Sequence, residues 1–170
     1  MAGTNRTLVV LRHATAEPEG DLGDAQRPLS GRGRQQAGEI GRLLAEQLGG
    51  FDVVLVSAAL RTTETAKLVT AALPDRPEPQ VRRELYGAGP RQVLELLAEL
   101  PADAARVLII GHEPTMSSLA ALLGGTKDPL TAQVSFGIGT GNAVVIDVPV
   151  GWDELGRGAA QLRAVLGPQG

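Results

Sequence analysis

Short runs of apolar residues alternate along the chain with longer amphipathic segments. The strongest runs cover residues 7–12, 51–56 and 107–111, are rich in β-branched side chains, and are followed by glycine or polar residues. Runs of this length and composition predict strands buried in a parallel sheet. Weaker runs predict a short strand near residues 80–83 and two more at 143–148 and 161–166, the last at a sheet edge.

Four segments between these runs carry apolar residues at helical spacing. In the first, Ser30 is a suitable N-cap, the apolar residues that follow share one face, and Gly49 predicts the end of the helix near residue 48. Pro90 suits the first position of another helix, because no hydrogen-bond donor is needed there. The predicted helices cover residues 30–48, 60–73, 90–100 and 115–123.

The alternation of strands and helices predicts an α/β fold around a mostly parallel central sheet. Helices on both faces of that sheet make a three-layer sandwich. The 170 residues fit one domain, which we expect to span residues 1–170, because no internal repeat or low-complexity segment divides them.

Composition excludes several classes of function. The net charge of -3 gives no positive field that would attract nucleic acid or anionic lipid. The absence of cysteine excludes disulfides, thiolate metal sites and a cysteine nucleophile. The N-terminal residues lack the apolar region of a signal peptide, and no apolar stretch approaches the length of a membrane span. We therefore expect a cytoplasmic protein; its oligomeric state is left open.

The two histidines of the chain each follow a predicted buried strand. His13 follows the run at residues 7–12, and His112 follows the run at 107–111. Ligands of open α/β sheets bind at the carboxyl ends of the strands, so both imidazoles are expected at the functional edge if these strands are neighbours. Imidazole is well suited to act as nucleophile or acid near neutral pH. Arg12 precedes His13, and guanidinium groups favour phosphate and carboxylate.

Two further features agree with an anion site at this edge. Arg61 lies in the first turn of the predicted helix 60–73, where a cation opposes the helix dipole unless an anion lies between them. His112 lies in a turn, residues 111–115, that leads directly into a helix with free N–H groups. Taken singly, Arg61 could be a solvated surface residue and His112 an idle residue of a capped turn.

Four motifs together resemble the histidine phosphatase superfamily, and most closely its short SixA-type phosphohistidine phosphatases. They are Leu11-Arg12-His13-Ala14, Arg27-Pro28-Leu29-Ser30, the segment 57–66, and Ile110-Gly111-His112-Glu113-Pro114. The resemblance extends in order and spacing to about Val148. Ala14 replaces the family's more common glycine, and Ala58 replaces a frequent proline; neither change removes a reactive group.

The resemblance implies a phosphoglycerate mutase-like fold and a role for each matching residue. His13 resembles the nucleophile that becomes phosphorylated, Arg12 and Arg61 resemble the arginines that hold the phosphoryl group, and His112 resembles the histidine that stabilises the transition state. Arg27 resembles the extra, substrate-binding arginine of the short branch. The implied activity is a phosphatase that needs no metal or other cofactor. Two distant histidines without cysteine do not make a zinc site.

Glu84 has two interpretations. It lies in a segment, residues 83–87, that resembles the one where mutases and ester phosphatases keep a carboxylic proton donor. It could also be a surface residue paired with Arg82 or Arg83. An alkoxide leaving group needs such a donor, whereas imidazole, with a conjugate acid of pKa about 6.5, needs it much less.

Three functions remain open from the sequence. The first is hydrolysis of phosphohistidine on a partner protein, which suits an open site because the loops at residues 14–28 and 84–90 are short. The second is a broad phosphomonoesterase or mutase-like enzyme for small phosphate esters that uses Glu84 as the acid. The third is a non-catalytic module that binds phosphorylated ligands, although binding alone would not need His13.

Overall fold

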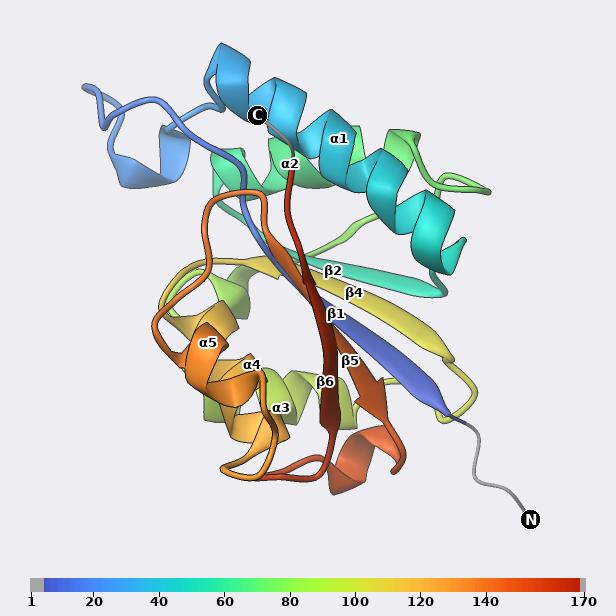
Figure 1. Ribbon diagram of the computed structural model, residues 1–170. Coiled ribbons are helices and arrows are strands. Elements are labelled where there is room, and N and C mark those ends of the chain that lie inside the picture. Colours follow the sequence, from blue (N-terminus) through green and yellow to red (C-terminus); the bar gives the residue numbers. More distant parts are fainter. Residues whose placement is uncertain (1–4, 169–170) are drawn as a thin grey trace.

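A single six-stranded sheet forms the centre of the molecule, which we describe from a computed structural model over residues 5–168. The strands follow the order β3-β2-β4-β1-β5-β6 across the sheet (Figure 1). Parallel pairing joins β1, β4, β2 and β3, whereas β5 runs antiparallel to both of its neighbours. The strands are β1 (Arg6–Arg12), β2 (Val53–Ser57), β3 (Gln80–Arg82), β4 (Arg106–Gly111), β5 (Ala143–Val148) and β6 (Gln161–Leu166).

Helices cover both faces of the sheet. Helices α1 (Gly31–Leu48) and α2 (Leu60–Ala71) lie on one face, and α3 (Pro90–Ala98), α4 (Thr115–Gly124) and α5 (Thr131–Ser135) lie on the other (Figure 1). Three short 3-10 helices span Asp24–Gln26, Arg83–Leu85 and Trp152–Glu154. The predicted three-layer α/β architecture is confirmed.

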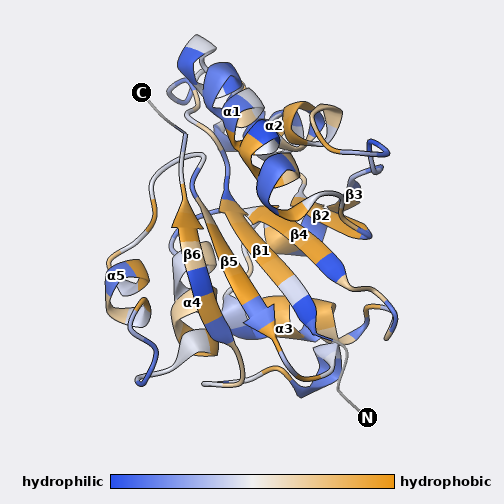
Figure 2. Ribbon diagram, turned by 45° about the vertical axis from the view of Figure 1, so that its right-hand side comes forward, coloured by the Kyte–Doolittle hydropathy of each residue, from blue (hydrophilic) through white to orange (hydrophobic). Residues whose placement is uncertain are grey.

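The alternation of side chains along each strand creates two separate cores. In β1, Val9 and Leu11 pack with α1 and α2, whereas Leu8 and Val10 pack with α3 and α4. Successive residues of a strand point to opposite faces, so a strand buried on both sides is apolar throughout. Figure 2 shows this pattern, with apolar strands between helices whose outer faces are hydrophilic.

Most predicted elements are confirmed, with small differences at their ends. β2 begins at Val53, later than predicted, because the Asp52 carboxylate accepts hydrogen bonds from the N–H groups of Ala105 and Arg106, both at 2.9 Å. The helices predicted to reach residues 73 and 100 end earlier, at residues 71 and 98. Helix α5 was not predicted. No helix in the described part of the chain has the length and apolar character needed to cross a membrane.

The loop between β1 and α1 is fixed tightly to the start of α1. Ser30 caps the helix as predicted, accepting from the Gly33 N–H at 3.0 Å, and its hydroxyl donates to the Thr15 carbonyl at 3.1 Å. A Cβ atom on Gly33 would lie 1.9 Å from that carbonyl oxygen, so only glycine fits here. The residues that follow β1 are thereby held in one position.

Neighbouring parallel strands bring the predicted site residues to one edge. β4 lies between β1 and β2, and Arg12 at the end of β1 pairs with Gly111 at the end of β4. The strands β1, β4 and β2 are therefore neighbours. This is the condition under which His13, His112 and Arg61, which follow these strands, can converge.

Candidate active site

His13 is held in one tautomer by the backbone beside it. Its side chain is buried, with 8% of the residue exposed, and its Nδ1 lies 2.8 Å from the Ala14 carbonyl oxygen. A carbonyl oxygen can only accept, so Nδ1 carries the proton. Nε2 is left with a free lone pair, as a nucleophile requires.

The backbone after His13 is fixed by a second set of hydrogen bonds around Thr15. The Thr15 N–H and hydroxyl both donate to Oε1 of Gln36 at 2.9 Å, and the hydroxyl also lies 2.8 Å from Oγ1 of Thr140. Residues of α1 and of the loop before β5 thus hold the segment that orients the His13 ring.

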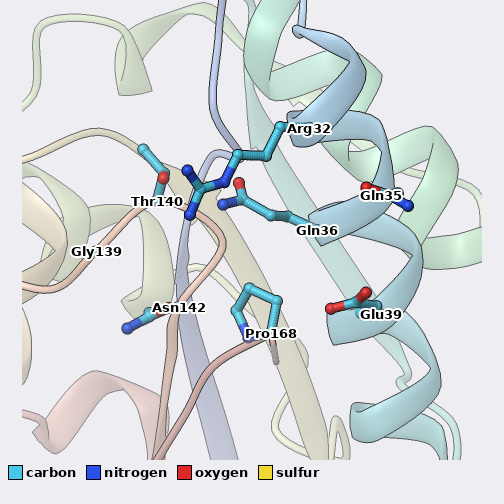
Figure 3. Close-up of a pocket in the computed structure, with 8 residues that line it drawn as sticks. All are labelled: Arg32, Gln35, Gln36, Glu39, Gly139, Thr140, Asn142 and Pro168. Carbon is cyan, nitrogen blue, oxygen red and sulfur yellow. The ribbon is translucent and has the colours of Figure 1, made fainter. Parts of the chain in front are cut away.

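Gln36 and Thr140 also line a pocket of about 260 Å³ between α1 and the loop before β5 (Figure 3). Its other lining residues are Arg32, Gln35, Glu39, Gly139, Asn142 and Pro168. None of the predicted site residues lines this pocket, so it is a neighbour of the site and not the site itself.

His112 faces His13, with the two ring centroids 5.5 Å apart. Its Nδ1 lies 3.3 Å from an Arg61 nitrogen and its Nε2 lies 2.8 Å from the Ser57 hydroxyl. Guanidinium can only donate, so Nδ1 accepts and Nε2 carries the proton. The second ring is therefore neutral and fixed by residues at the end of β2 and the start of α2.

Both histidines have pKa values well below the usual range. Burial lowers the pKa of His13 to about 4; the Ala14 carbonyl opposes this shift, and the charge of Arg61 adds to it. Burial, followed by the charge of Arg61, also lowers the pKa of His112 to about 4. Both rings are thus neutral near pH 7, the protonation state in which His13 can attack phosphorus.

Arg12 and Arg61 bring two guanidinium groups to the histidines. Arg12 donates to the Ile138 carbonyl at 2.9 Å. Arg61, which is 6% exposed, donates to the backbone carbonyl and the carboxylate of Asp24 at 2.9 and 3.0 Å. The Nε atoms of both arginines are buried without a hydrogen-bond partner among the described residues. Such unsatisfied donors favour an anionic ligand at this position.

Asp24 joins the arginines of the site to the short 3-10 helix of the first loop. Its carboxylate accepts from Arg61, from Arg27 at 3.2 Å and from the Tyr86 hydroxyl at 2.5 Å. The hydrogen bond from Tyr86, followed by those from Arg27 and Arg61, lowers the pKa of Asp24 to about 2. Asp24 is therefore an ionised acceptor that orients two cations.

Sequence reasoning singled out the histidines and arginines, which the structure brings together, but not Asp24, Tyr86 and Ser57, which contact them. The Tyr86 ring lies edge-on to His112 at 5.6 Å between centroids, and its partner Asp24 is 62 positions away. The one sequence signal was the position of Asp24 three residues before Arg27, which places both on one side of a helical turn.

Arg27 and Glu84 lie further from the rings. Arg27 donates to the Glu17 carbonyl at 2.8 Å and to Asp24, so it reaches the site through that carboxylate. Glu84 pairs with Arg82 at 3.1 Å, and its side chain is 58% exposed. The surface ion pair with Arg82 that one interpretation predicted is thus present. The role of Glu84 as a proton donor stays a prediction. Across residues 5–168, no three His, Asp or Glu side chains gather in a group that could hold a metal ion.

Comparisons with known proteins agree with this geometry. A model of the histidine phosphatase superfamily (branch 1) matches residues 8–88. An uncharacterised protein of Mycobacterium tuberculosis is 34% identical over 156 residues, which cover 89% of this chain and 96% of that protein. An uncharacterised protein of Mycobacterium leprae is 31% identical over 165 residues, covering 94% of this chain and 100% of that protein.

Solved structures share the whole fold. A protein of Nakamurella multipartitia designated phosphohistidine phosphatase SixA has a TM-score of 0.88 and 29% identity, covering 99% of both chains. A protein histidine phosphatase SixA complexed with tungstate has a TM-score of 0.79 at 23% identity, covering 95% of this chain and 97% of that one. A phosphoglycerate mutase from Plasmodium falciparum has a TM-score of 0.64 at 18% identity, covering 95% and 90%. The likeness to the mutase shows that the fold is phosphoglycerate mutase-like.

Proposed function

We propose that this chain, which belongs to the histidine phosphatase superfamily, is a phosphohistidine phosphatase that works through phosphorylated His13. Its substrate is phosphohistidine on a partner protein, and the reaction needs no metal ion. The observation that carries the proposal is the hydrogen bond from His13 Nδ1 to the Ala14 carbonyl, because it leaves Nε2 free at a site where two arginines, Arg12 and Arg61, keep buried Nε donors without a partner. The similarity to the structure designated SixA supports the choice of substrate.

In the first step, Nε2 of His13 attacks the phosphorus atom, and the P–N bond of the substrate breaks. The departing ring takes the bonding electron pair and leaves as neutral imidazole when its other nitrogen is protonated. Arg12 and Arg61 neutralise the charge on the phosphoryl oxygens. His112, held by the Ser57 hydroxyl and facing His13, completes the polar surroundings of the phosphoryl group.

In the second step, water attacks the phosphorus atom and the bond to Nε2 breaks. Because Nδ1 keeps its proton, phosphorylated His13 is a cationic ring that departs as neutral imidazole. The nucleophile is therefore regenerated without a proton transfer to it, and both protons of the attacking water leave with inorganic phosphate, as dihydrogen phosphate. The fixed tautomer thus serves both steps.

The surroundings of the site favour a phosphoramidate over an alkyl phosphate. An alkoxide leaving group needs a proton donor of raised pKa. Asp24 has a lowered pKa of about 2 and is ionised, and Glu84 lies in a surface ion pair with Arg82. Imidazole needs no comparable donor, so phosphohistidine fits this set of residues best.

Turnover of a phosphohistidine protein beside a panel of alkyl phosphates tests the choice of substrate, with wild type and Glu84→Gln compared on both. We expect faster turnover of phosphohistidine, and little effect of Glu84→Gln on either substrate, since exposed ion pairs contribute only about 0–1 kcal/mol. A different result would identify an esterase that uses Glu84 as its acid. In that case the wild type prefers an alkyl ester, and Glu84→Gln lowers the turnover of that ester by roughly 10²–10⁴-fold. Wild-type protein that binds phosphate but turns over neither substrate would identify a binding module.

A further inference from the structure

We propose that the surface around the candidate active site is a docking surface for a protein whose phosphohistidine is flanked by basic and apolar side chains. Leu22 and Phe136 supply apolar contacts, and the acidic segment 17–24 pairs with the basic side chains. The inference deepens the proposed function, since it assumes a phosphohistidine protein as the substrate and names how that protein is recognised.

Phe136 is the most exposed large apolar residue of the described chain, at 93%. It directly follows α5 and begins the loop that reaches the site: two residues later, the Ile138 carbonyl accepts from Arg12. Of the four Phe, Trp and Tyr residues in the chain, Phe51 and Trp152 fill the cores, Tyr86 contacts His112, and Phe136 lies in the segment that leads to the Arg12 partner Ile138. Half of this small aromatic set is thus placed where a protein substrate would be bound, and aromatic residues are enriched at interfaces.

Leu22 is 82% exposed in the loop between β1 and α1. Two residues later, Asp24 binds Arg61 through both its carbonyl and its carboxylate. Figure 1 shows this loop and the loop after α5 on different sides of the carboxyl edge of the sheet. The two apolar side chains therefore belong to separate loops that border one site.

The loop that carries Leu22 is acidic. Glu17, Glu19, Asp21 and Asp24 lie in residues 17–24, and no lysine or arginine does. Glu17, Glu19 and Asp21 are exposed, and their side chains form no ion pair within residues 5–168.

This charge does not serve the phosphoryl group itself, because negative side chains beside the site repel an anion. It is complementary to a partner that carries basic residues next to its phosphohistidine. Opposite charges at an interface raise the rate of association and exclude partners of the wrong sign. The acidic segment therefore selects among phosphohistidine proteins, while the arginines bind the phosphoryl group that all of them share.

The test uses three substrates: free phosphohistidine and two versions of a small helical bundle with one surface histidine phosphorylated by phosphoramidate. In one bundle, lysine and leucine flank the histidine; in the other, glutamate and serine flank it. For wild type we expect kcat/KM at least about 10-fold higher for the lysine bundle than for the glutamate bundle. Rising salt should reduce that preference.

Variants then locate the contacts. Leu22→Ser and Phe136→Ser should each raise KM for the lysine bundle about 3- to 10-fold and leave free phosphohistidine unchanged. The triple variant Glu17→Gln, Glu19→Gln, Asp21→Asn should remove the preference for lysine over glutamate. Matched controls on exposed helix faces, Glu46→Gln of α1 and Glu95→Gln of α3, should change nothing.

The outcomes separate this inference from the proposed function. If wild type hydrolyses neither bundle nor free phosphohistidine, the proposed function is wrong. If it hydrolyses them but all variants match wild type, or the glutamate bundle is preferred, the docking surface is wrong. A dimer of wild type that Phe136→Ser converts to monomer, measured by light scattering, would show that a second copy of this chain covers the surface and would also overturn the inference.

Discussion

Asp24 binds Arg61 through two different acceptors, its backbone carbonyl at 2.9 Å and its carboxylate at 3.0 Å. The two bonds go to separate nitrogens of the guanidinium group, and the Nε atom is left buried without a partner. The same carboxylate also accepts from Arg27. One residue thus sets the positions of two cations, and because it is already ionised, it does so without acting as an acid.

We predict that Asp24→Ala lowers kcat by about 10- to 100-fold, since a displaced arginine no longer meets the transferring phosphoryl group. Asp24→Asn keeps a hydrogen-bond acceptor and should lose less. Asp21→Asn, an exposed change in the same loop, is the control and should stay within about 2-fold of wild type. Steady-state kinetics with free phosphohistidine measure the effect, and a fully active Asp24→Ala would contradict the positioning role.

Arg61→Ala should be more damaging than Arg27→Ala. Arg61 is buried against His112 and should contact the phosphoryl group directly, so its loss should lower kcat by roughly 10²–10³-fold. Arg27 hydrogen-bonds to Asp24 and to the Glu17 carbonyl, so its loss should mainly raise KM, by about 10-fold. Equal losses confined to kcat in both variants would show that Arg27 also holds the transition state.

The two histidines should both titrate near pH 4. With only two in the chain, NMR of the imidazole protons follows each one, and His112→Asn assigns the signals. Their pKa values are lowered from 6.5 by burial, so the folded protein binds protons less readily than the unfolded chain. The resulting stabilisation is complete above about pH 6.5 and is lost as the pH falls towards 4. Midpoints near 6.5 would contradict the buried, neutral pair.

Chelation should leave activity unchanged, while vanadate should inhibit. The arginines and histidines supply the positive and polar surroundings that a five-coordinate phosphoryl group requires, and vanadate adopts that geometry. The assay measures turnover after dialysis against EDTA, with and without added divalent metal. Loss of activity on chelation and recovery with a metal would overturn the proposed mechanism.

The sequence predicted the parts of the molecule that follow from local pattern. β1 and β4 are apolar on both faces, so their strands and the residues at their ends, His13 and His112, could be placed from sequence alone. Ser30 could be identified as a helix cap because the capping residue and the helix are adjacent in the chain.

What the sequence did not predict depends on contacts between distant segments. Tyr86 meets Asp24, and Gln36 meets Thr15, only after the sheet has formed and its loops have packed together. Helix α5 has five residues, too few to show an apolar periodicity. The tautomers of His13 and His112 likewise depend on which acceptor or donor lies beside each nitrogen, which no periodic pattern encodes.

The central claim is that His13 becomes phosphorylated through Nε2, and trapping that intermediate tests it most directly. Enzyme mixed with ³²P-labelled phosphohistidine protein and quenched in alkali, where phosphohistidine survives, should carry label that mass spectrometry locates on His13. His13→Ala should carry none and should lose turnover, while His112→Ala should still be labelled, more slowly. Label on another residue, or wild-type turnover in His13→Ala, would contradict the account.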